Sequence, residues 1–186
     1  MQIFDFEFIV NLIPIMIKYL GVTFKMSLLA LVLGIVVAMI IAFIVDADIP
    51  VLKRLSKIYI SFFRGTPLVA QLFFIYFGLI KIIPALKELS AFNAAVIVLG
   101  LNSSAYFAES LRGAISSVDK GQAEACYAFG MTYIQAMVRV ILPQAIRVAI
   151  PAMTNTFADI IKGSSLAFTI GVTEIMATAQ SEAAAT

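Results

Sequence analysis

The feature that most limits the fold of this chain is an uncharged apolar run from Met26 to Val45. A helix of about 20 apolar residues is long enough to cross the hydrocarbon core of a bilayer. In lipid, a spanning segment must satisfy its backbone hydrogen bonds internally, and a helix does this along its whole length. The run therefore predicts an integral membrane protein built from helices.

Three further segments are apolar enough to be candidate spans. Residues 58–80 carry Arg64 as their only charge, and residues 89–108 are uncharged. Residues 148–168 are the least clean candidate, because two opposite charges lie within them. We therefore expect an all-α integral membrane domain with about four spans.

The amino-terminal segment lacks the pattern of a cleaved signal peptide. Asp5 and Glu7 stand where a signal peptide has basic residues, and the apolar run that follows is too long. We expect residues 1–18 to form an interfacial lead-in and residues 19–186 to form one membrane domain.

Composition excludes several classes of function. Hydrophobic residues make up 62% of the chain and charged residues 13%, a balance with which a soluble domain of this size would aggregate. The chain has no His and a single cysteine, Cys126, so metal catalysis, Ser-His chemistry and a disulfide framework are not expected. It has no phosphate-binding loop of the GxxxxGK[ST] type, so we expect neither an enzyme nor a bound cofactor.

Basic residues in the loops predict the orientation in the membrane. Residues 53–57 hold one basic cluster, and residues 112–147 hold a second between the third and fourth spans. Lys81 and Lys87 lie on the opposite side and are outnumbered. We therefore expect the amino terminus outside and residues 121–143 in the cytoplasm.

Small residues recur at every fourth position of the first span, at Ala30, Gly34, Ala38 and Ala42. Helices in lipid associate through close backbone approach, and small residues allow it. This stripe predicts either a packing seam, within the chain or against a neighbouring subunit, or a functional surface.

The segment between the third and fourth spans is polar and has the signals of a short helix. Ser and Asp side chains at residues 116–119 can cap its start, and Glu124 adds favourable negative charge near that end. Gly130 can end it, and Pro143 can start or kink the helix that returns to the membrane. We expect a helix of about three turns over residues 121–132. It either enters a cleft on another protein or lies on the membrane surface.

This segment, GQAEACYAFGMTYIQAMVRVILP, resembles the EAA signature of permease subunits from bacterial ABC importers. In that family the triplet, a glycine after a fixed gap and a Leu-Pro pair mark the coupling helix that docks on the ATPase subunit. Cys126 departs from the usual third alanine. The residues to which the resemblance gives an ATPase-coupling role are Gly121, Gln122, Glu124, Ala125, Gly130, Leu142 and Pro143.

A second motif resembles the FRGTPL signature of polar amino acid permeases of the histidine, glutamine and arginine type. Its residues here are Arg64, Gly65, Thr66, Pro67 and Gln71. Pro67 is tolerated near a helix start in the membrane, where freed backbone groups find other partners. Arg64 either snorkels to the cytoplasmic interface or contacts a neighbouring subunit. The runs NSSAYFAESLRGAI, LPQA and KGSSL are similar to the same subfamily.

The resemblance implies a fold, a function and partners. The fold is the transmembrane domain of a type 1 ABC importer in the bacterial inner membrane. The function is that of a permease subunit that forms the translocation path for polar amino acids. Its partners are ATPase subunits that bind the ATP, a second permease subunit of the same or a related chain, and an extracytoplasmic amino-acid-binding protein. A fifth span is expected after Glu174, so the chain is expected to be truncated at its carboxyl end.

Polar groups in the fourth span mark a candidate substrate path, because ionisable groups inside a membrane are expensive and by default functional. One hypothesis is that Asn155 and Asp159 line a polar path for a zwitterionic amino acid. The other is that Asp159 and Lys162, one helical turn apart, form an internal ion pair that holds the helix in place.

The sequence is also compatible with two other functions. An ion-coupled carrier or channel would use polar relays in the membrane, of which this chain has few. A non-transporting assembly subunit would need only the helices and the exposed loop.

Overall fold

The structure is a computed structural model that describes residues 6–46 and 49–185. Every regular element in those ranges is helical. The elements are α1 (Phe6–Asp46), α2 (Pro50–Gly65), α3 (Leu68–Phe73), the π-helix η1 (Phe74–Leu79), α4 (Ile80–Ile82), η2 (Pro84–Leu86), α5 (Ala91–Ser117), α6 (Lys120–Ala128), α7 (Tyr133–Ala136), the π-helix η3 (Met137–Ile141), α8 (Leu142–Gly163), the 3-10 helix η4 (Ser164–Ile170) and α9 (Ile175–Ala185).

Three helical stretches of the described chain are long and apolar enough to cross a membrane. They are residues 8–45, 91–117 and 133–170. A fourth crossing results if α2 and the helical run Leu68–Ile82 count as one bent span. The predicted all-helical membrane fold is therefore confirmed.

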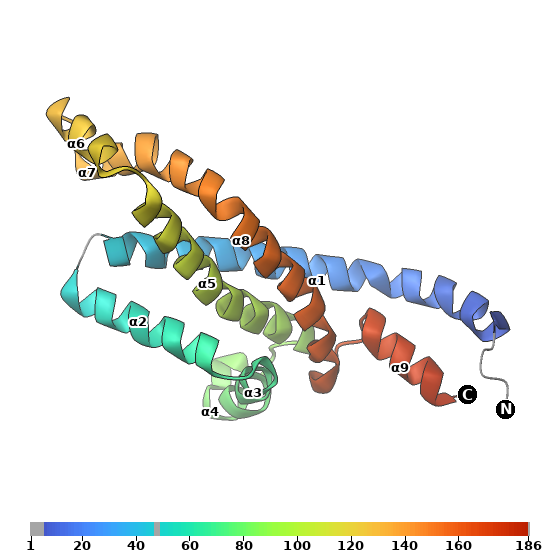
Figure 1. Cartoon of the computed structure of the whole chain (residues 1–186). Helices are drawn as coiled ribbons and strands as arrows, with labels where there is room; N and C mark the ends of the chain where they lie inside the picture. Colours follow the sequence, from blue (N-terminus) through green and yellow to red (C-terminus); the bar gives the residue numbers. More distant parts are fainter. Residues whose placement is uncertain (1–5, 47–48, 186) are drawn as a thin grey trace.

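Helix α1 is continuous from Phe6 to Asp46 and extends well beyond the bundle (Figure 1). Residues 6–18, expected to be a lead-in, belong to this same helix, so no break separates them from the span. The exposed Lys18 does not interrupt the helix, and exposed apolar residues such as Val10, Ile13 and Ile17 lie on the same stretch. Residues 1–5 of the expected lead-in lie outside the described residues.

The small-residue stripe of α1 packs against α5, within the chain. Ala30 and Ala38 are fully buried. A Cβ added at Gly34 would lie 2.5 Å from the Ser103 hydroxyl oxygen and 3.2 Å from the Gly100 carbonyl oxygen. The predicted packing seam is thus confirmed, and it lies within the chain, between α1 and α5.

The second predicted span is broken. Helix α2 ends at Gly65, and the chain turns by 110° before the helical run resumes at Leu68. Pro67 has no backbone N–H and disfavours a helical conformation in the residue before it. Thr66 is accordingly extended, with φ −114° and ψ 144°. Pro67 lies directly before the start of α3, as the sequence predicted.

Helix α5 is the centre of the bundle, with α1, α2 and α8 packed around it (Figure 1). The buried α5 side chains include Val98, Phe107 and Leu111. Ser90 caps its start by accepting a hydrogen bond from the Asn93 N–H. Tyr59 ties α2 to it, because its hydroxyl lies 2.7 Å from the Ser104 hydroxyl oxygen.

Helix α9 begins directly after Glu174, where the family resemblance places a further span. The Glu174 side chain is fully buried. One carboxylate oxygen accepts the Ala177 N–H at 2.7 Å, and the other accepts the Thr23 hydroxyl of α1 at 3.4 Å. The Thr23 oxygen in turn accepts the Ile175 N–H at 3.3 Å. A buried polar cluster therefore fixes the start of α9 against α1.

Candidate coupling and translocation site

Helix α6 is the short helix that the polar segment predicted, and it protrudes at one end of the bundle (Figure 1). Asp119 caps its start, since its carboxylate accepts the Gly121 N–H at 2.7 Å. Gly130, with φ +76°, ends it. The Gly130 N–H bonds to the Tyr127 carbonyl at 2.9 Å, and the Met131 N–H bonds to the Cys126 carbonyl at 3.0 Å.

This pair of hydrogen bonds is the Schellman closure, which needs a left-handed residue and therefore favours glycine. The helix accordingly ends at Ala128, after 9 residues, rather than at residue 132 as expected. Both predicted signals, Asp119 at the start and Gly130 at the end, are confirmed as helix boundaries.

The outer face of α6 carries the residues of the EAA resemblance. Glu124 and Ala125 are exposed, whereas Cys126 is only 5% exposed and faces the bundle. The departure from the usual third alanine therefore lies on the inner face. Sequence reasoning missed Phe129, which is 86% exposed beside Gly130. Its signal in the sequence is a bulky aromatic residue within a polar loop, a position where an exposed side chain can contact a partner.

The chain leaves α6 through a second capped turn. The Thr132 hydroxyl accepts the Gln135 N–H at 3.3 Å, and the Gln135 side chain accepts the Thr132 N–H at 2.9 Å. This reciprocal pair is a capping box. It starts the helical stretch that runs through η3 into α8, where Pro143 occupies the first turn.

One hydrogen bond joins α6 to the start of α8. The Gln144 side-chain amide donates to the Gln122 side-chain oxygen at 3.4 Å and to the Val140 carbonyl at 2.9 Å. Gln122 thus contacts α8, while Leu142 is half-buried and Pro143 is exposed. The coupling residues named from the resemblance lie on α6, on its closing turn and at the start of α8.

The FRGTPL residues form the break between α2 and α3. The buried Gln71 amide donates to the Phe63 carbonyl at 3.0 Å, the Thr66 carbonyl at 3.1 Å and the Thr66 hydroxyl at 2.8 Å. Asn102 of α5 donates to the same Phe63 carbonyl at 3.0 Å and to the Gln71 side-chain oxygen at 3.1 Å.

These bonds satisfy carbonyl groups that the end of α2 leaves without helical partners. Inside a membrane no bulk water replaces such partners, so a broken helix needs polar side chains beside it. Gln71 and Asn102 supply them, which explains why an amide follows Pro67 at this spacing. Asn102 was not among the predicted site residues.

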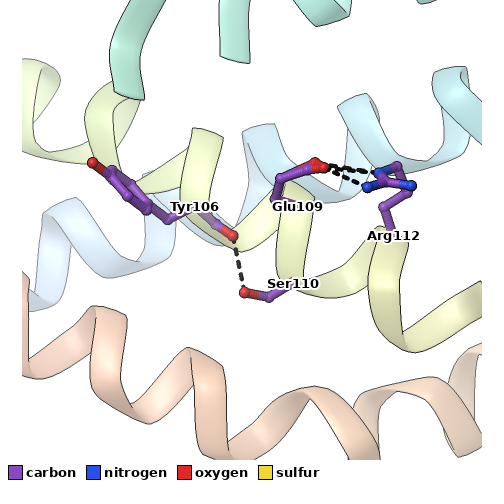
Figure 2. Close-up of polar contacts among 4 residues, drawn as sticks. All are labelled: Tyr106, Glu109, Ser110 and Arg112. Atoms are coloured by element: carbon purple, nitrogen blue, oxygen red, sulfur yellow. Dashed lines mark hydrogen bonds and ion pairs between the residues drawn. The ribbon is translucent and has the colours of Figure 1, made fainter. Parts of the chain in front are cut away.

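Arg64 has a partner within the chain, which neither expectation for it included. Its guanidinium lies over the Tyr106 ring, 5.3 Å from the centroid. Figure 2 shows Tyr106 on α5, one turn before the ion pair in which Arg112 Nη2 lies 2.6 Å from Glu109 Oε1. Ser110 donates its hydroxyl to the Tyr106 carbonyl at 3.0 Å.

The candidate substrate residues lie on α8. The Lys162 nitrogen is 3.6 Å from an Asp159 carboxylate oxygen, and both side chains are about three-quarters exposed, at 77% and 74%. Asp159 lines a cleft of 280 Å³ between α5 and α8, together with Asn102, Tyr106 and Thr156. Asn155 is exposed, and neither it nor Lys162 lines this cleft.

The site offers binding and coupling groups rather than reactive ones. Within residues 6–46 and 49–185, no group of three His, Cys, Asp or Glu side chains could hold a metal ion. The polar side chains of the cleft are carboxylate, amide and hydroxyl groups, which hydrogen-bond a small polar molecule.

The chain is thus a helical membrane domain with a broken span and a protruding capped helix between two crossings, and the family match assigns it to a class of transport proteins. The chain belongs to the family described as binding-protein-dependent transport system inner membrane component, which matches residues 34–185. It is therefore a membrane subunit of an ABC transport system and not an enzyme.

Similar proteins agree with this assignment. The chain is 54% identical over 180 residues to the probable amino-acid ABC transporter permease protein PatM of Vibrio harveyi, covering 97% of this chain and 81% of that protein. It is 49% identical over 177 residues to the probable amino-acid permease protein YxeN of Bacillus subtilis, covering 95% and 79%. A crystal structure of an amino acid ABC transporter with histidines has a TM-score of 0.84 at 38% identity, covering 96% of this chain and 82% of that chain.

Proposed function

We propose that this permease subunit imports polar amino acids and that α6 docks on an ATPase subunit in the cytoplasm. The observation that carries the proposal is the exposed, doubly capped α6 with Phe129 at its tip. The names of the similar proteins, which are amino-acid permeases, support the substrate class. The amino terminus is then outside.

The proposed assembly contains partners that supply what this chain lacks. ATPase subunits bind and hydrolyse the ATP, a second permease subunit completes the path, and an extracytoplasmic protein delivers the amino acid. The absence of a GxxxxGK[ST] loop in the sequence supports the first assignment.

The contacts of α6 support a role in transmitting motion. Its start is capped by Asp119, its end is closed at Gly130, and the Gln122–Gln144 hydrogen bond joins it to α8. Helix α8 packs on α5. A displacement of α6 by the ATPase therefore passes to helices that line the cleft, as alternating access requires.

We further propose that Asn155, Asp159 and Lys162 belong to the substrate path. The Asp159 carboxylate in the 280 Å³ cleft suits the ammonium group of an amino acid, and Asn102 and Thr156 are placed to hydrogen-bond it. The 3.6 Å contact between Lys162 and Asp159 is long and exposed, so an ammonium group can replace it at small cost. Asn155 lies one helical turn before Asp159 on the same helix.

Uptake by the assembled transporter in proteoliposomes tests the proposal. We expect amino acid uptake that requires ATP and is unaffected by an uncoupler, whereas an uncoupler-sensitive uptake would indicate an ion-coupled carrier. Asp159→Asn should weaken uptake about tenfold, because a charge-assisted bond to the ammonium becomes a neutral one. Thr154→Val, an exposed change on the same helix, is the control. Unchanged uptake by Asp159→Asn in a well-expressed complex would remove Asp159 from the path.

A further inference from the structure

A larger cleft, of 920 Å³, lies at the end of the bundle that carries α6. It is formed by the carboxyl-terminal end of α1, one face of α2 and the last turns of α5. Among the described residues that line it, four are cationic and one is anionic. The cations are Lys53, Lys57, Arg64 and Arg112, and the anion is Glu109.

Even with Lys53 left out, the described residues of the lining hold more cations than carboxylates, because Lys57, Arg64 and Arg112 outnumber Glu109. Glu109 is already committed to Arg112, with which it forms three hydrogen bonds of 2.6 to 3.2 Å. Arg64 contacts the face of an aromatic ring, which leaves its full charge in place. The lining therefore carries a net positive charge, and it selects an anion.

The outward side of α2 is apolar where the cleft side is basic. Val51, Leu55 and Ile58 recur at helical spacing and are 71%, 57% and 60% exposed. With Arg54, they line a groove of 480 Å³ on the outer surface of the helix. A third groove, lined by Pro50, Lys53, Arg54 and Lys57, shares residues with both. A continuous surface thus leads from a basic cleft to an apolar groove.

We propose that this cleft binds the headgroup phosphate of an anionic phospholipid, with the acyl chains along the apolar groove of α2. Basic pockets between transmembrane helices on the cytoplasmic side suit anionic headgroups. A free phosphate would use only the cations, whereas a phospholipid uses both surfaces. The inference rests on the proposed function in one respect, the cytoplasmic location of the end that carries α6.

Because the cations lie on two separate helices, a bound lipid contacts both helices. Lys57 and Arg64 lie on α2, whereas Arg112 lies on α5. Arg112 keeps its partner Glu109, and a phosphate that also accepts from the α2 cations links the two helices beside the broken span. The bound lipid therefore stabilises α2 against α5.

Native mass spectrometry of the purified chain in detergent tests the site, with phosphatidylglycerol, phosphatidylcholine and inorganic phosphate as probes. We expect saturable binding of phosphatidylglycerol and weaker binding of phosphatidylcholine. Lys57→Gln should weaken phosphatidylglycerol binding about fivefold, the effect of one cation near an anionic headgroup. Lys57→Arg keeps the charge and should bind like the native chain. Arg147→Gln, which removes an exposed cation of α8 outside the cleft, should leave binding unchanged.

Three results would overturn the proposal. They are equal binding of the two lipids, native-like binding by Lys57→Gln, and displacement of phosphatidylglycerol by millimolar inorganic phosphate, which would indicate a site for a free anion. The binding assay contains no ATPase, so its failure is distinct from a failure of α6 to dock, which is measured separately by retention of the ATPase.

Discussion

Replacing Gln71 with leucine removes the amide that bridges the break between α2 and α3. The Thr66 carbonyl then loses the side chain that satisfies it, and Asn102 loses one acceptor. The Phe63 carbonyl keeps its bond from Asn102, and the Thr66 hydroxyl keeps the Phe62 carbonyl. One orphaned carbonyl at about 1 to 3 kcal/mol is therefore the main loss in the free energy of unfolding.

Thermal unfolding of the purified chain in detergent measures this loss. For a chain of this size, 1 kcal/mol corresponds to about 2 to 4 °C in Tm, so a loss of about 1 to 3 kcal/mol lowers Tm by roughly 2 to 12 °C. Gln180→Leu, an exposed change in α9, is the matched control and should shift Tm by less than about 2 °C. Two results would refute this account of the break. One is a Gln71→Leu variant with the Tm of the native chain. The other is an Asn102→Leu substitution that lowers Tm by the same amount in the Gln71→Leu variant as in the native chain.

The other predictions concern helix packing and helix ends, each with a change in Tm or hydrogen exchange as its measure. Gly34→Ala should destabilise the chain by about 1 to 3 kcal/mol through overpacking at the α1–α5 seam, whereas Gly113→Ala, whose added Cβ meets nothing within 4 Å, should be neutral or stabilising. Equal effects of the two would contradict the seam. Gly130→Ala should cost about 1 to 2 kcal/mol because of its positive φ, and Gly130→Asn less, since Asn tolerates that conformation. An Ala variant as stable as the Asn variant would argue against the Schellman closure. Thr23→Val should speed amide exchange at the start of α9, and unchanged exchange there would show that the contact with Thr23 does not hold this helix against α1.

The elements that were predicted correctly are those that depend on residues close together in the sequence. An apolar run of 20 residues is long enough to cross a membrane whatever the rest of the chain does. Asp119 and Gly130 act on backbone groups within four residues of themselves. The spacing of Ala30 and Gly34 places both on one face of a helix in any context. These features follow from short-range geometry, which a sequence contains.

The features that sequence missed depend on contacts between distant residues. Asn102 reaches Gln71 across 31 positions, and Thr23 reaches Glu174 across 151. The face of α8 that borders the cleft is set by its packing on α5, so Asp159 lines the cleft and Asn155 does not. The 110° turn at Pro67 also lies within an apolar segment that hydropathy alone treats as continuous.

Retention of the ATPase subunit by the detergent-purified chain is the most direct test of docking through α6. Phe129→Ala removes the most exposed aromatic side chain of the closing turn, and Phe168→Ala, at an exposed phenylalanine of η4, is the matched control. We predict that the native chain and Phe168→Ala retain the ATPase, and that Phe129→Ala binds it about tenfold more weakly, as truncation of an interface anchor does. Equal retention by Phe129→Ala and the native chain, or no retention by the native chain, would contradict the account.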